Sequence, residues 1–220
     1  AGTALMPDIT LAGLAPDLAF RLSGSVVRQR AAALIELVQR RVPQAEIVVF
    51  VDEPSLVSVA AAALKIDRRA AVDLVSSVLA VIEHDAISGL HCCGPADWGL
   101  LLPAGPQVVS LPTCAGIDRA PGAVTDYLER GGWLAWGAVP TDRPLGPTPD
   151  RYWRELMFEW DLLVAADCDP ALLRTQSILT PACGLPHHGI TQAEQVMGFA
   201  SDLAERLRDR SKEVDLSVGA

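Results

Sequence analysis

The chain has 220 residues, half of them hydrophobic and a fifth charged, which is the composition of a folded globular protein and excludes a disordered one. Its net charge of -9, with no stretch that concentrates Lys and Arg among aromatic residues, argues against nucleic acid as a partner. The longest apolar runs fall far short of the roughly 20 residues that a membrane span needs, so we expect no membrane partner either.

Length and cysteine content predict a single domain over residues 1–220 in a reducing compartment. No linker-like stretch divides the chain, and its length is sufficient to bury a sizeable core. Five cysteines, an odd number in a domain of ordinary size, argue against a secreted disulfide framework. No signal peptide is recognisable, so we expect a cytoplasmic protein. The first residue is Ala, which is consistent with a chain that begins partway through a longer gene product.

Short β-rich runs alternate with helical stretches along the chain. Strands are predicted, in chain order, over 8–13, 46–54, 86–94, 107–114, 132–140 and 177–184. Helices are predicted over 23–42, 55–65, 67–83, 95–104, 121–130, 149–165 and 191–211. In the first of these helices, the spacing of Val26, Leu34 and Leu37 predicts the buried face. The order indicates a parallel sheet with helical crossovers, and the continuous apolar strands predict helices on both of its faces.

Two α/β architectures satisfy this alternation, an open doubly wound sheet and a (β/α)8 TIM barrel. Polar residues follow at least three of the predicted strands, which favours the barrel, because all of its active-site residues come from that rim. A whole barrel takes about 250 residues, and only five strands are secure here. We therefore expect an incomplete barrel whose early strands are missing from this chain.

The strand at 86–94 ends in Gly-Leu-His-Cys-Cys-Gly. Side chains two residues apart on a strand share a face, so His91 and Cys93 are expected to lie side by side, with Cys92 facing the opposite way. Zinc prefers nitrogen and sulfur ligands, and a catalytic zinc takes three protein ligands and leaves one position open. Cys183, which follows a later strand, is the natural third ligand.

Three strings of residues at strand ends carry a family resemblance. "FVDEPSL" (50–56), "HCCG" (91–94) and "TPACGL" (180–185), in that order, resemble the catalytic domain of cobalamin-independent methionine synthase and its shorter core relatives. The resemblance covers nearly all of this chain but only the later part of the family's barrel. It implies a zinc-dependent methyltransferase that transfers a methyl group to a small thiol, with homocysteine as the expected acceptor.

The same resemblance implies roles for individual residues. His91, Cys93 and Cys183 correspond to zinc ligands of the family. The zinc ion binds the substrate thiol and lowers its pKa, so that the thiol coordinates as the nucleophilic thiolate. Asp52 corresponds to a residue that accepts hydrogen bonds from the substrate's amino group, and Glu53 beside it would support the site.

Two departures from the family's pattern affect these expectations. Pro112 stands about where the family has a Glu ligand, and Cys114 is a candidate substitute as fourth ligand. The folate-using members carry a histidine that protonates the leaving amine, and the corresponding segment 137–146 has none. Asp142 is the only acid close by and the candidate proton donor. We therefore expect a methylated corrinoid, rather than a methylfolate, as the methyl donor.

Other readings of these residues stay open. The same zinc ligands would serve alkyl transfer to another thiol such as coenzyme M, for which Arg119 and Arg143 could hold an acidic substrate. Cys114 could instead be an ordinary buried thiol, and Asp52 could cap a following helix. The chain could also be a non-catalytic barrel remnant that acts as a binding subunit or a homo-oligomer, because an incomplete barrel exposes a strand edge.

Overall fold

The computed structural model describes residues 13, 15–53, 68–186 and 188–218. The predicted strand at 8–13, apart from Gly13, and the predicted helix at 55–65 lie outside these residues. No helix in the described part of the chain is both long and apolar enough to span a membrane.

The chain folds as a mixed α/β structure with a five-stranded, all-parallel sheet. The strands follow one another in sequence order across the sheet: β1 Val48–Asp52, β2 Ile87–His91, β3 Val108–Pro112, β4 Trp133–Val139 and β5 Ser177–Pro181. The described helices are α2 Pro16–Arg41, α4 Arg68–Glu83, α5 Trp98–Leu101, α6 Pro121–Glu129, α7 Asp150–Ala165, α8 Pro170–Thr175 and α9 Ile190–Val218. The five secure strand predictions are confirmed.

Short helical segments complete this set of elements. The 3-10 turns η1 Leu102–Ala104 and η2 Ile117–Arg119 follow α5 and precede α6, respectively. The sequence did not predict α8, which begins where the Asp169 carboxylate accepts a hydrogen bond from the Ala171 N–H at 2.7 Å. Pro170 occupies the first position of this helix, where a missing N–H costs nothing.

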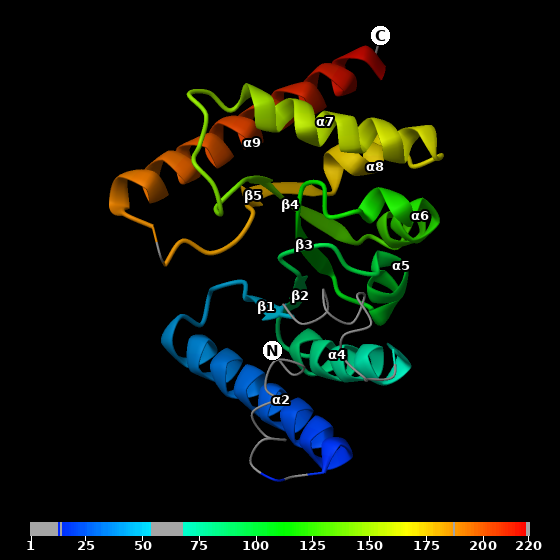
Figure 1. Cartoon of the computed structure of the whole chain (residues 1–220), viewed down its shortest axis with the longest axis vertical. Helices are drawn as coiled ribbons and strands as arrows, with labels where there is room; N and C mark the ends of the chain where they lie inside the picture. Colours follow the sequence, from blue (N-terminus) through cyan, green and yellow to red (C-terminus); the bar gives the residue numbers. More distant parts are fainter. Residues whose placement is uncertain (1–12, 14, 54–67, 187, 219–220) are drawn as a thin grey trace. The chain divides into compact units, whose positions relative to one another are not determined.

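The chain divides into two compact units, 1–109 and 110–220, with the boundary inside β3. In the first unit, α4 packs along β1 and β2, and α2 packs against α4 (Figure 1). The buried side chains of α4 recur at helical spacing, which explains why this segment forms an amphipathic helix; they are Ala71, Leu74, Val75, Val78, Leu79 and Ile82.

The buried face of α2 differs from the predicted one. Val26, Leu34 and Leu37 are exposed, and the face turned inward carries mostly small residues: Ala19, Ser23, Ala31 and Ile35. A Cβ atom at Gly24 would collide with the Leu74 side chain of α4. The two helices approach closely, so small residues rather than the larger leucines occupy the contact.

At β1, the described helices do not cover both faces of the sheet. Val49 and Val51 are buried, but Val48 and Phe50, which point the other way, are 47% and 41% exposed. Among the described residues, β1 lies at the edge of the sheet and α4 packs against one of its faces. Gly89 of β2 leaves room for the Phe50 ring, since a Cβ there would lie 2.5 Å from the nearest ring atom.

The second unit has a more completely buried strand. β4 is buried from Leu134 to its end, with α7 and α9 packed against it, and α9 also contacts β5 (Figure 1). The Trp136 ring of β4 lies 6.3 Å from the Trp160 ring of α7, and its Nε1–H donates to the Ser177 hydroxyl at 2.9 Å. The ring contact joins α7 to β4, and the hydrogen bond joins β4 to β5.

Candidate functional site

In the first unit, the predicted residues lie where β1 and β2 end. Asp52, the last residue of β1, pairs in register with His91, the last residue of β2, and the Glu53 N–H donates to the His91 carbonyl at 2.9 Å. His91 is half-buried and Cys93 is exposed, while Cys92 is fully buried, as the strand geometry predicted. The Asp52 side chain is exposed, whereas Glu53 is only 2% exposed.

In the second unit, the ends of β3, β4 and β5 come together around Gly137. The Thr113 N–H donates to the Gly137 carbonyl at 3.3 Å, and the Ala182 N–H donates to the Val139 carbonyl at 2.8 Å. A Cβ at Gly137 would lie 2.6 Å from the Ala182 Cα, so only glycine fits between these backbones. Cys114 and Cys183 follow Thr113 and Ala182 directly, which places both thiols just beyond the ends of the strands that flank β4.

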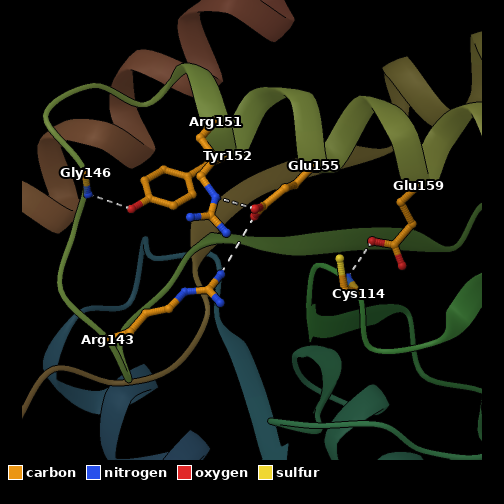
Figure 2. Close-up of polar contacts among 7 residues, drawn as sticks. All are labelled: Cys114, Arg143, Gly146, Arg151, Tyr152, Glu155 and Glu159. Atoms are coloured by element: carbon orange, nitrogen blue, oxygen red, sulfur yellow. Dashed lines mark hydrogen bonds and ion pairs between the residues drawn. The ribbon is translucent and has the colours of Figure 1, made fainter.

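Cys114 has an unusual backbone conformation and a carboxylate partner. Its φ of 64° lies in the left-handed region, which non-glycine residues seldom adopt. Its N–H donates to Glu159 Oε2 at 2.8 Å (Figure 2), and its side chain is exposed. Partial burial of the thiol, followed by the nearby carboxylates of Glu159 and Glu155, raises the pKa of Cys114. The isolated chain therefore favours the neutral thiol at this position.

Glu159 is a buried carboxyl group that the sequence pattern did not single out. Its side chain is 3% exposed, and its Oε1 atom has no hydrogen-bond partner among the described residues. Burial chiefly, with a smaller contribution from Asp118, raises the pKa of Glu159 to about 7, although the Cys114 N–H opposes this shift. A signal was present in the sequence, because Glu159 falls on the apolar stripe of α7 formed by Tyr152, Leu156, Trp160 and Leu163.

A second polar group lies at the beginning of α7. Arg151 Nε is 2.7 Å from Glu155 Oε1, and an Arg143 terminal nitrogen is 3.8 Å from Glu155 Oε2, so two guanidinium groups face one carboxylate (Figure 2). Arg143 comes from the loop after β4. Asp142, the predicted proton donor, is exposed in the same loop, three residues beyond the end of β4.

The predicted zinc ligands are divided between the two units. His91 and Cys93 belong to the first unit, and Cys114 and Cys183 belong to the second. Among the residues that the structure describes, no three His, Cys, Asp or Glu side chains form a group that could hold a metal ion. The donor types do fit zinc, since all five cysteines are free and three of them are exposed.

Comparison with known proteins adds no family to these observations. No protein-family model matches the chain, and no curated protein matches its sequence.

Proposed function

We propose that this chain is a zinc-dependent thiol methyltransferase of the methionine synthase type, with homocysteine as acceptor and a methylated corrinoid as donor. We further propose that its sheet is the later part of a (β/α)8 barrel. One observation carries the proposal: Cys93, Cys114 and Cys183 each lie two residues beyond the last residue of a parallel strand, and these are the three exposed cysteines. The two buried cysteines, Cys92 and Cys168, do not occupy such positions.

This distribution of thiols favours chemistry over packing. Free cysteine is among the most buried residue types, so chance does not readily expose three thiols at matching positions. In parallel α/β sheets, ligands bind at the carboxyl ends of the strands. His91, which ends β2, adds the imidazole nitrogen that zinc takes alongside sulfur.

The remaining residues of the chain then have defined tasks. When bound, zinc supplies a Lewis acid that lowers the pKa of the acceptor thiol toward neutrality. The exposed Asp52 carboxylate, in register with His91, accepts hydrogen bonds from the acceptor's ammonium group and orients the thiol. Cys114, two residues beyond β3, would supply the fourth ligand in place of the family's Glu. A corrinoid donor requires no proton from Asp142.

The zinc content of the purified protein tests this proposal. We expect a stoichiometric zinc in the wild type that is lost in Cys93→Ala and in Cys183→Ala. The loss of affinity should exceed the roughly 10–100-fold that removal of an outer-shell partner causes. Cys92→Ala is the matched control, because it removes the adjacent but buried thiol and should retain zinc. Circular dichroism of each variant checks that the fold is kept.

Zinc-edge absorption with homocysteine then tests the acceptor. A further sulfur ligand should appear when homocysteine is added, whereas methionine, which has no thiol, should change nothing. Absence of zinc from the wild type would refute the assignment, as would retention of zinc in both ligand variants. A zinc-edge spectrum that does not change with any added thiol, coenzyme M included, would also refute the assignment.

The open face of β1 favours a second candidate function, that of a binding subunit that pairs with another copy of this chain. Val48 and Phe50 are exposed on the strand that lies at the edge of the sheet in the described part of the chain, and such a surface can associate with a second polypeptide. Sedimentation equilibrium should then show a dimer that Phe50→Lys dissociates. A monodisperse wild-type monomer would contradict this candidate.

A further inference from the structure

A pocket of about 510 Å³ lies between the loop after β4 and the first turns of α7. Its walls include Arg143, Gly146, Asp150, Arg151 and Arg154. All of them belong to the second unit of the chain, so the pocket is formed within one compact part of the molecule. Figure 2 shows the loop that carries Arg143 and Gly146 as it runs up to the beginning of α7.

The pocket concentrates positive charge in a chain whose net charge is -9. Three arginines line it against one aspartate, and Asp150 is already engaged, because Arg206 of α9 lies 2.7 Å from its Oδ1. The Thr148 hydroxyl also donates to Asp150, at 2.9 Å. The one acidic group in the pocket wall is therefore engaged by Arg206 from outside the pocket and by Thr148 from within the wall.

The guanidinium groups retain donors for a ligand. Each guanidinium carries five N–H donors. Arg151 directs its Nε–H to Glu155, and Arg143 approaches the same carboxylate with a terminal nitrogen (Figure 2). Arg154 makes no hydrogen bond or salt bridge among the described residues, although its charge acts on the Asp150 carboxylate and helps to lower the pKa of that group. Glu155 thus shows how a carboxylate sits between two of these groups while most of their donors remain available.

The wall of the pocket is held in place before any ligand arrives. The Gly146 N–H donates to the Tyr152 hydroxyl at 3.0 Å, and the Tyr152 ring is buried. Pro144 and Pro147, on either side of Gly146, restrict the backbone of the loop. A fixed wall lowers the entropy that binding would otherwise cost.

We propose that this pocket binds a multiply charged oxyanion, a phosphoryl group or a set of carboxylates, through Arg143, Arg151 and Arg154. Phosphate and carboxylate share the spacing of oxygen atoms that the guanidinium fork matches in bidentate pairs. The first turn of α7, a helix of 16 residues, adds its positive dipole end to the same region. The site requires neither zinc nor a methyl donor, so it goes beyond the function proposed above.

Titration of the purified full chain with three salts at matched ionic strength tests this inference. The probes are pyrophosphate, propane-1,2,3-tricarboxylate and sodium chloride, and the readout is heat by calorimetry. We expect saturable binding of at least one polyanion and none of chloride. Binding of pyrophosphate alone assigns a phosphoryl ligand, binding of the tricarboxylate alone assigns a carboxylate ligand, and binding of both supports the shared oxyanion chemistry.

Variants that each remove one positive charge, inside or outside the pocket, locate the site. Arg143→Gln and Arg154→Gln should each weaken binding about tenfold, because each removes hydrogen bonds to a charged group. Arg30→Gln, which removes an exposed arginine from α2, is the control and should leave binding unchanged. Absence of saturable binding would overturn the inference, and so would an equal loss in the control. Because the titration uses no metal, its failure is independent of the zinc result.

Discussion

The buried carboxyl group of Glu159 makes the stability of this protein depend on pH. Burial raises the pKa of Glu159 to about 7 from an ordinary value of 4.5. Between these two values, the unfolded chain releases the proton while the folded chain keeps it. The stabilising effect of the bound proton is therefore complete below pH 4.5 and is lost as the pH rises through about 7.

The size of the effect follows from the gap between the two pKa values. At about 1.4 kcal/mol per pKa unit, the gap corresponds to about 3 kcal/mol of unfolding free energy. Glu159→Gln keeps the shape of the side chain and an oxygen acceptor for the Cys114 N–H, but it does not ionise. The wild type has already lost part of this stabilisation at pH 5, so relative to it the variant should gain about 2.5 kcal/mol between about pH 5 and pH 8.

Urea unfolding at several pH values measures this difference. Four of the five tryptophans lie in the second unit together with Glu159, so tryptophan fluorescence reports mainly on the relevant part of the chain. The protein should first be treated with a chelator, so that no cation alters the field at the carboxyl group. Glu205→Gln on α9 is the control, because it removes an exposed carboxylate and changes the net charge equally.

The reasoning would be refuted if the unfolding free energies of wild type and variant, plotted against pH, ran parallel. If the difference in unfolding free energy between wild type and Glu159→Gln stays constant from about pH 5 to pH 8, Glu159 is not the cause of the pH dependence. A control variant that behaves like Glu159→Gln would refute it equally, since net charge rather than burial would then be the cause.

Two further predictions follow from exposure and from backbone contact. A thiol reagent should modify Cys93, Cys114 and Cys183 in the folded protein, and Cys92 and Cys168 only after unfolding. Mass spectrometry maps the modified residues, and reaction of Cys92 or Cys168 in the folded protein would contradict the structure. Gly137→Ala should lower the free energy of unfolding by about 2 kcal/mol, because its Cβ would press on the Ala182 backbone. Gly122→Ala, with no atom within 4 Å of the added Cβ, should not destabilise in the same urea assay, and equal losses would disprove the crowding.

Much of the fold could be predicted because local patterns of apolar and polar residues indicate its strands and helices. Each secure strand is a short apolar run bounded by turn-forming residues, and each was found within a few residues of its place. The alternation of Cys92 and Cys93 between buried and exposed follows from the two-residue period of a strand alone. The short helix α8 was missed because a single turn with a capping Asp169 carries little periodicity.

The exposure of individual faces could not be predicted in the same way. The apolar spacing of Val26, Leu34 and Leu37 is helical, yet these side chains are exposed, because α2 approaches α4 through its small residues. Glu159 lies on an apolar stripe, but only the packing of α7 shows that its carboxyl group is buried beside the Cys114 N–H. A zinc site depends in the same way on how side chains from distant strands pack together, so the zinc assignment stays a prediction.

The sequence by itself determines the order of strands and helices and the position of each thiol and imidazole relative to the end of its strand, because both depend on local backbone periodicity. Only the tertiary structure decides that Gly137 must remain a glycine, that burial raises the pKa of Glu159 to about 7, and that three arginines line one pocket. These properties arise from atoms that are distant in sequence and close in space. Burial and electrostatic fields depend on distance in space, which local patterns do not encode.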